Sequence, residues 1–176
     1  ISKISFIKKI YYGRAVYDKK EINAVLSVLK NDSLSLIDGK KVKTLEKKIS
    51  QIFGKKYGLM VNSGSSALTL ANNVLNFKKG DEIITPCLNF GTAVSSIILS
   101  GAKPIFVDVE TETLQIDLNK IEEKITKKTK GIIVPNLIGN FPDWIYIRII
   151  ANIFNLYIIE DSADRLGAII GYLSTG

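Results

Sequence analysis

Short apolar segments alternate with helical segments from Tyr57 to the end of the chain, and this alternation limits the folds that the chain can adopt. Five segments have the length and composition of buried strands: 57–62, 82–86, 104–108, 130–135 and 156–160. Helical patterns fill the spaces between them, at 66–76, 90–100, 117–126 and 142–154. Strands joined by single helices form right-handed crossovers, which make the strands parallel and cover both faces of the sheet. The sequence therefore predicts an α/β fold with a mainly parallel sheet.

Two further helical patterns precede these strands, at 18–30 and 42–53. Asp18 is the predicted N-cap of the first, with Glu21 at the spacing of a capping box. We expect two parts, an N-terminal helical segment over 1–56 and a strand–helix domain over 57–176. Residues 162–171 resemble the start of another strand or hairpin, and the sequence begins without methionine. The chain is therefore expected to be the N-terminal part of a longer, truncated protein.

A turn rich in small and hydroxyl side chains lies between the first predicted strand and its helix. It reads Asn62-Ser63-Gly64-Ser65-Ser66. Such a turn directs free backbone N–H groups and hydroxyls at one point, where a helix N-terminus holds a phosphate. The alternative is an ordinary helix cap, because serine, asparagine and glycine are common at strand–helix turns.

A carboxylate, Asp161, follows the last predicted strand. Open α/β sheets bind their ligands just outside the carboxyl ends of the strands. Asp161 on its own is also compatible with a cap for the turn that follows it. Together with the phosphate turn, it predicts a phosphorylated cofactor that has a cationic ring nitrogen.

The composition excludes several kinds of site. The chain has no histidine and one cysteine, Cys87, so an internal disulfide, a zinc site of the usual kind and a Ser-His or Cys-His nucleophile are excluded, and no metal is expected. Cys87 follows a proline at a strand end, and we interpret it as a packing residue rather than a nucleophile. No glycine-rich dinucleotide or P-loop motif occurs.

The net charge of +7 arises from 24 Lys and Arg against 17 Asp and Glu. The lysines are spread in pairs and have no interleaved aromatic residues, so a solvated surface is expected and nucleic acid is not. A weak preference for anionic substrates is the alternative. No apolar run is long enough to span a membrane, and a cytoplasmic protein is expected.

Several motifs in order along the chain resemble those of the DegT/DnrJ/EryC1/StrS sugar aminotransferase family, which belongs to the fold-type-I pyridoxal phosphate enzymes. They are Ser63–Leu68, Gly80–Pro86, Phe90, Gly101–Val109, Lys128–Lys130, Ile159–Ala163 and Gly167-Ala168. The resemblance implies a fold-type-I large domain with three αβα layers, here incomplete. It also implies pyridoxal or pyridoxamine phosphate as the cofactor, a nucleotide-linked sugar as the substrate and a homodimer.

The resemblance gives roles to particular residues. Gly64, Ser65 and Ser66 would hold the cofactor phosphate, and Phe90 would stack on the pyridine ring. The alternative for Phe90 is an ordinary core residue at a helix start. Asp161 would pair with the ring nitrogen and keep it protonated, so that the ring acts as an electron sink.

Two positions depart from the pattern of the family's aminotransferases. Asp164 replaces a glutamine, and Ile138-Gly139-Asn140 replaces Tyr-Gly-Gln. Both resemble the family's dehydrase branch, which removes the 3-hydroxyl of a nucleotide-linked 4-keto-hexose with pyridoxamine phosphate and needs a reductase partner. Asp164 would then lie near the cofactor's 3-hydroxyl, or it is a solvent-facing turn residue.

The family's Schiff-base lysine, or the histidine that replaces it in the dehydrase branch, is expected beyond Gly176. We therefore expect this chain alone to be inactive. The resemblance implies amino transfer to a keto-sugar in polysaccharide or glycoside biosynthesis as the function, and 3-dehydration of a nucleotide-linked 4-keto-6-deoxyhexose is the closely ranked alternative. A non-catalytic chain, or a domain that binds another phosphate ligand, is a further alternative.

Overall fold

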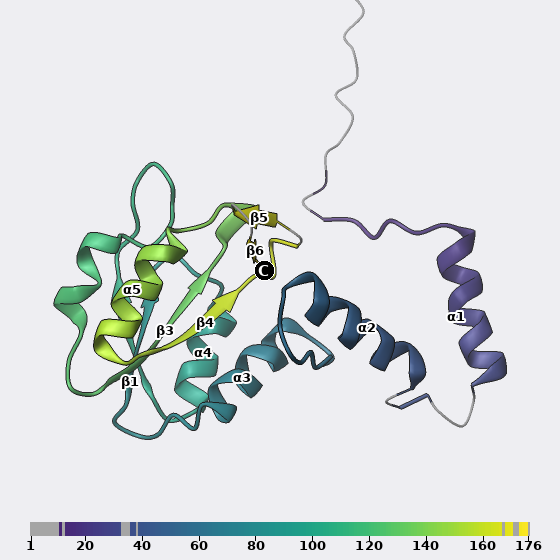
Figure 1. Ribbon diagram of the computed structural model, residues 1–176, viewed down its shortest axis with the longest axis horizontal. Helices are drawn as coiled ribbons and strands as arrows, with labels where there is room; N and C mark the ends of the chain where they lie inside the picture. Colours follow the sequence, from purple (N-terminus) through teal and green to yellow (C-terminus); the bar gives the residue numbers. More distant parts are fainter. Residues whose placement is uncertain are drawn as a thin grey trace, which may run out of the picture. The chain divides into compact units, whose positions relative to one another are not determined.

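The fold was analysed in a computed structural model of the chain (Figure 1). It describes residues 11, 13–32, 36–37, 39–166, 168–170 and 173–175. The contacts divide the chain into two units, 1–44 and 45–176, and each is described by itself. The predicted boundary after residue 56 stays a prediction.

Helix α1, Lys19–Asn31, begins with the capping box that the sequence predicts. The Asp18 carboxylate accepts a hydrogen bond from the Lys20 N–H at 2.6 Å, and the Glu21 carboxylate accepts one from the Asp18 N–H at 2.7 Å. These bonds satisfy N–H groups that the first helical turn leaves without intrahelical partners. Helix α2, Lys40–Ile52, follows, and its last turn gives way to Gly54, which has a positive φ of 59°.

A parallel sheet of four strands forms the centre of the second unit. The strands are β1 Glu82–Pro86, β2 Lys103–Val107, β3 Thr129–Pro135 and β4 Tyr157–Asp161. They lie in the order β2-β1-β3-β4, and every neighbouring pair is parallel. All four match strands predicted from the sequence, which confirms the α/β class.

Helices cover both faces of this sheet, so the fold has three layers (Figure 1). They are α3 Gly64–Val74, α4 Gly91–Leu99 and α5 Trp144–Phe154. Successive residues of a strand point to opposite faces. Accordingly Ile84 and Ile132 pack in a cluster with residues of α5, whereas Ile83 and Ile133 pack in a second cluster with Ile97 of α4.

Two predicted elements are wrong. Residues 57–62 form no strand: their exposed apolar side chains include Tyr57 and Leu59, and the Met60 N–H bonds to the Glu46 side chain at 2.9 Å. A strand needs a neighbouring strand, and none of the described strands lies beside this segment.

The predicted helix over 117–126 is also wrong. The segment forms two 3₁₀ turns, Leu118–Lys120 and Glu122–Lys124. Its bonds span three residues, such as Lys124 N–H to the Ile121 carbonyl at 3.0 Å, and the backbone becomes extended at Ile125. The side chain of Ile121 is fully buried in the core beside α5, which explains the helix-like apolar spacing.

The last elements are two short strands, β5 Ala168–Ile170 and β6 Leu173–Thr175, which pair as an antiparallel hairpin. This confirms the predicted strand or hairpin after Asp161. Within the residues that the structure describes, no helix has both the length and the apolar character to cross a lipid bilayer.

Candidate cofactor site

Asp161 is the last residue of β4 and lies level with Pro135, the last residue of β3. One oxygen of its carboxylate, Oδ1, accepts a hydrogen bond from the Ala163 N–H at 3.2 Å. Asp161 therefore does cap the turn that follows it. Its second oxygen accepts no hydrogen bond within the described part of the chain, so the carboxylate retains an acceptor for a ligand.

The pleat of β4 assigns Asp161 to one face of the sheet. Ile159 packs against the α4 cluster, whereas Ile158 packs against the α5 cluster. Because side chains alternate along a strand, Asp161 belongs to the same face as Ile159, which is the face that α3 and α4 cover.

Phe90 also lies at this edge and on this face, as the residue that precedes the first turn of α4. Its side chain is 70% exposed, so it is not a core residue. The Asn89 side chain fixes the turn before it. Its Oδ1 accepts a hydrogen bond from the Phe90 N–H at 2.7 Å, and its Nδ2 donates to the buried Thr85 hydroxyl at 3.0 Å. The ring of Phe90 is therefore accessible for stacking on a planar ligand.

Ser63 caps α3, which the site prediction did not include. Its hydroxyl accepts a hydrogen bond from the Ser66 N–H at 3.1 Å and donates one to the Ser66 hydroxyl at 3.1 Å. Because the Ser66 N–H is already used, Ser66 can offer a ligand only its hydroxyl. A serine just before a helical run is the signal for such a cap.

The N-terminus of α3 keeps two donors available. The N–H groups of Gly64 and Ser65 donate no hydrogen bond to any described residue, and a Cβ added to Gly64 would meet nothing within 4 Å. This open helix N-terminus suits a phosphate. Helices α3 and α4 are held together by the Asn72 amide, which donates to the Ser96 hydroxyl at 3.0 Å. The turn 62–66 and Phe90 begin these two helices, which cover the sheet face to which the pleat assigns Asp161.

From the sequence, Asp164 is expected near the cofactor's 3-hydroxyl or in a solvent-facing turn, and its contact with the cofactor stays a prediction. Asp164 lies exposed in the turn after β4, and its carboxylate accepts a hydrogen bond from the Ile138 N–H at 3.2 Å. Ile138 has a φ of 56°, which is unusual for a β-branched residue, and Gly139 follows with a φ of 76°. The two positions that depart from the aminotransferase pattern are therefore in direct contact.

Arg165 strengthens the same contact. Its guanidinium donates a hydrogen bond to the Gly139 carbonyl at 3.3 Å and lies 4.2 Å from the centre of the Phe141 ring. The turn after β4 and the loop after β3 are thus joined by a carboxylate, a guanidinium and a cation–π contact.

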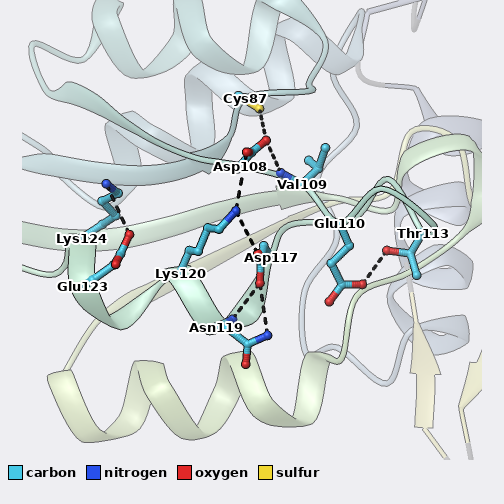
Figure 2. A network of polar contacts seen from close by, with 10 residues as sticks. All are labelled: Cys87, Asp108, Val109, Glu110, Thr113, Asp117, Asn119, Lys120, Glu123 and Lys124. Carbon is cyan, nitrogen blue, oxygen red and sulfur yellow. Dashed lines mark hydrogen bonds and ion pairs between the residues drawn. The ribbon is translucent and has the colours of Figure 1, made fainter.

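A second polar network lies where β1 and β2 end (Figure 2). The Asp108 carboxylate accepts hydrogen bonds from the Val109 N–H at 2.9 Å and from the Cys87 thiol at 3.5 Å, and it pairs with Lys120 at 3.6 Å. Lys120 also pairs with Asp117 at 3.2 Å. The prediction that Cys87 is a packing residue is wrong: Cys87 is exposed, because β1 ends one residue earlier.

These contacts shift two pKa values. The Val109 N–H, then the Cys87 thiol and Lys120, lower the pKa of Asp108 below its usual value of 3.8. The hydrogen bond with Asp117, aided by the charge of Asp108, raises the pKa of Lys120 above 10.5. No group of three or more candidate metal ligands occurs among the described residues.

The residues at the α3–α4 face fit pyridoxal phosphate by their chemistry. The open N-terminus of α3 suits its phosphate, exposed Phe90 suits its ring, and the acceptor left on Asp161 suits its ring nitrogen. These matches rest on the described side chains alone.

Comparisons with known proteins give the same picture. The chain is 36% identical over 160 residues to GDP-4-keto-6-deoxy-D-mannose 3-dehydratase of Yersinia pseudotuberculosis, a match that covers 88% of this chain and 40% of that protein. It is 38% identical over 130 residues to GDP-perosamine synthase of Escherichia coli O157:H7, covering 74% of this chain and 36% of that protein. The chain thus spans about 40% of the length of the curated relatives that it matches first.

Solved structures share the fold. A crystal structure of GDP-4-keto-6-deoxymannose-3-dehydratase with a trapped PLP-glutamate geminal diamine superposes with a TM-score of 0.87 at 33% identity, covering 96% of this chain and 45% of that chain. The aminotransferase from Psychrobacter cryohalolentis superposes with a TM-score of 0.82 at 32% identity, covering 88% of this chain and 39% of that chain.

The family model described as the DegT/DnrJ/EryC1/StrS aminotransferase family matches residues 16–172, which is most of the chain. This family depends on pyridoxal phosphate, and its solved structures include forms with pyridoxal or pyridoxamine phosphate bound. The chain therefore belongs to the DegT/DnrJ/EryC1/StrS aminotransferase family.

Proposed function

We propose that the protein containing this chain is a pyridoxal or pyridoxamine phosphate enzyme that modifies a nucleotide-linked keto-sugar. The observation that carries the proposal is the position of Asp161. It ends β4 on the sheet face shared by Phe90 and the N-terminus of α3, and it keeps a carboxylate oxygen that no described residue uses.

Each residue has a distinct task in this proposal. Gly64 and Ser65 donate backbone N–H groups to the cofactor phosphate, and Ser66 donates its hydroxyl. Phe90 contacts one face of the pyridine ring and sets its plane. Asp161 would form an ion pair with the protonated ring nitrogen. Because the strand end is partly buried, this ion pair would be stronger there than in water.

The bound cofactor would supply an electron sink for the carbanion that forms when a proton is lost beside its nitrogen. Asp161 maintains that sink by holding the proton at the ring nitrogen. The capping bond from the Ala163 N–H limits how far the carboxylate can rotate away from it. Phe90 would exclude water from the ring face that it contacts.

We propose 3-dehydration of a nucleotide-linked 4-keto-6-deoxyhexose as the reaction. The specific support is the contact between Asp164 and Ile138, because the two departures from the aminotransferase pattern form one local structure rather than two unrelated changes. The similarity to GDP-4-keto-6-deoxymannose-3-dehydratase agrees with this choice. Asp164 itself is exposed and already bonded to Ile138. Its first proposed role is therefore to hold the conformation of this loop, and contact with the cofactor is secondary.

Amino transfer to a keto-sugar is the second candidate. It is supported by the similarity to GDP-perosamine synthase and to dTDP-3-amino-3,6-dideoxy-alpha-D-galactopyranose transaminase of Aneurinibacillus thermoaerophilus, which is 36% identical over 151 residues. A homodimer, a cytoplasmic location and, for dehydration, a reductase partner remain proposals, which sedimentation, fractionation and co-purification test.

The reaction is tested with the protein expressed from its complete gene. The enzyme is loaded with pyridoxamine phosphate and incubated with a nucleoside-diphosphate 4-keto-6-deoxyhexose, and the sugar is analysed by mass spectrometry. Replacement of the 3-hydroxyl by hydrogen, a net loss of one oxygen from the sugar, supports 3-dehydration; pyridoxamine phosphate then supplies the two electrons and ends as pyridoxal phosphate and ammonia. Replacement of the keto oxygen by an amine supports transfer. If neither product forms and the protein shows no cofactor absorbance, the non-catalytic alternative holds.

A matched variant tests the site. Asp161→Asn keeps the size and the capping acceptor of the side chain but removes its charge. We expect the turnover number to fall by about 100-fold or more, because the ring nitrogen loses its ion pair. Unchanged turnover in Asp161→Asn would remove Asp161 from the site.

A further inference from the structure

Asn136 is a buried side chain at the carboxyl edge of the sheet that the proposed function does not use. It follows the last residue of β3, and only 1% of its surface is exposed. Its amide nitrogen donates to the Glu160 carboxylate at 2.7 Å and to the Ser162 hydroxyl at 2.8 Å. Its carbonyl oxygen accepts a hydrogen bond from the Trp144 indole N–H at 2.9 Å.

These bonds account for the amide's two donor hydrogens and for one acceptor position on its oxygen. The side chain is buried, so its remaining lone pair has no open path to a ligand. Any influence of Asn136 on the site therefore passes through the residues that it holds.

Those residues lie on both sides of Asp161. Glu160 and Ser162 are its sequence neighbours, and they are also joined by a bond from the Ser162 hydroxyl to the Glu160 carboxylate at 2.9 Å. In addition, the backbone N–H of Asn136 donates to the carbonyl of Asp161 itself at 2.9 Å. Asn136 thus holds three consecutive residues at the end of β4.

The pleat places this network on the opposite face from the Asp161 carboxylate. Glu160 and Ser162 alternate with Asp161, so they belong with Ile158 to the α5 face, where Trp144 begins α5. The Asp161 carboxylate therefore lies on the α3–α4 face, whereas the residues that fix its backbone lie on the α5 face.

We propose that Asn136 is the positioning residue for Asp161: it holds the end of β4 from the α5 face and so aims the carboxylate at the cofactor's ring nitrogen. This inference rests on the proposed function of the site. A hydrogen bond to a charged group such as Glu160 contributes more to stability than a bond between neutral groups. We therefore expect loss of this network to free the end of β4 from its fixed position.

The test uses the protein expressed from its complete gene, loaded with pyridoxal phosphate labelled with ¹⁵N in the ring. NMR follows the protonation of the ring nitrogen as the pH is varied, and a fluorescence titration gives the dissociation constant of the cofactor. In Asn136→Ala we expect the midpoint of ring-nitrogen titration to fall by about one pH unit. The dissociation constant should rise about tenfold.

Thr129→Ala is the matched control. Thr129 is also buried, with 5% of its surface exposed, and its hydroxyl accepts a hydrogen bond from the Thr126 N–H at 2.9 Å. It begins β3, so it lies at the amino end of the strand, away from Asp161. It should lower the melting temperature without moving either cofactor value. If Asn136→Ala behaves in the same way, Asn136 is merely structural and the inference is wrong.

Milder variants keep the test decisive if Asn136→Ala does not fold. Ser162→Ala removes one of the bonds beside Asp161, and Trp144→Phe removes the donor to the Asn136 carbonyl. Each should shift the midpoint of ring-nitrogen titration in the same direction by a smaller amount, and wild-type midpoints in both would overturn the inference.

Asp161→Asn separates the two proposals. If it leaves the midpoint unchanged, the proposed site is wrong. If it alone shifts the midpoint, only the role of Asn136 is wrong.

Discussion

The carboxylate of Asp164 accepts a hydrogen bond from the backbone N–H of Ile138, across 3.2 Å between the turn after β4 and the loop after β3. Ile138 holds a left-handed conformation that costs a β-branched residue about 1–3 kcal/mol. The Asp164 bond and the Arg165 bond to Gly139 are among the contacts that hold the loop in this conformation, together with the bond from the Gln115 amide to the Leu137 carbonyl. The loop conformation thus depends on residues 26 positions away in sequence.

Replacement of Asp164 tests this dependence. In Asp164→Ala the amide of Ile138 loses its acceptor, and we expect its hydrogen exchange to accelerate by about tenfold. Asp164→Asn keeps an acceptor oxygen and should retain most of the protection. Equal exchange in wild type and Asp164→Ala would show that the contact does not hold the loop.

The two serines at the start of α3 should separate stability from binding. Ser63→Ala removes the N-cap and should lower the free energy of unfolding by about 1 kcal/mol, measured by urea denaturation. Ser65→Ala removes a hydroxyl that caps nothing and should leave stability unchanged. Its dissociation constant for pyridoxal phosphate should nevertheless rise severalfold.

The opposite pattern, with Ser65→Ala unstable and binding at wild-type strength, would move the phosphate away from this turn. Both variants are therefore measured for unfolding and for cofactor binding.

Gly131 in β3 has no room for a side chain. A Cβ there would lie 3.0 Å from Cζ of Phe77 and 3.2 Å from the carbonyl oxygen of Tyr157. We expect Gly131→Ala to destabilise the fold by about 1–3 kcal/mol, since overpacking a core forces neighbours to shift. Gly91→Ala is the control, because a Cβ there meets nothing within 4 Å. Equal midpoints of denaturation for the two variants would contradict the packing described for β3.

The ion pairs of Asp108 and Lys120 predict a pH window of stability. The pKa of Asp108 is lowered in the fold, so its contribution is present above 3.8, the usual value, and is lost as the pH falls through the folded value. The pKa of Lys120 is raised, so its contribution is present below 10.5 and is lost as the pH rises through the folded value.

Asp108→Asn should therefore lower the melting temperature slightly at neutral pH and not at all in strong acid. Both groups are exposed, so the difference is expected to be small and to shrink with added salt. A difference that persists unchanged in strong acid would show that Asp108 acts through something other than its charge.

The sequence predicted those parts of the fold that depend on local pattern. The four strands of the parallel sheet have apolar runs bounded by turn residues, and α1 has its capping box, so each is encoded within a few positions. The segment 57–62 has a strand-like composition too, but a strand also needs a partner, which composition cannot show. Ile121 illustrates the converse, because one buried side chain at helical spacing is compatible with a 3₁₀ turn.

The positions of Asp161 at a strand end and of Ser66 at a helix start were predictable from local motifs, and their roles toward the cofactor stay predictions. Asn136 was not predictable, since its partners Glu160 and Ser162 lie 24 and 26 residues away and meet it only through the register of β3 and β4. The burial of Cys87 was predicted wrongly because β1 ends at the buried Pro86, and the next residue is already exposed to solvent.

The most direct test is a crystal structure, with pyridoxal phosphate, of the protein expressed from its complete gene. We predict the phosphate at the N–H groups of Gly64 and Ser65, the ring against Phe90, and the ring nitrogen within hydrogen-bonding distance of the Asp161 carboxylate. A cofactor bound at any other edge of the sheet, or a ring nitrogen that faces a residue other than Asp161, would contradict the proposed site.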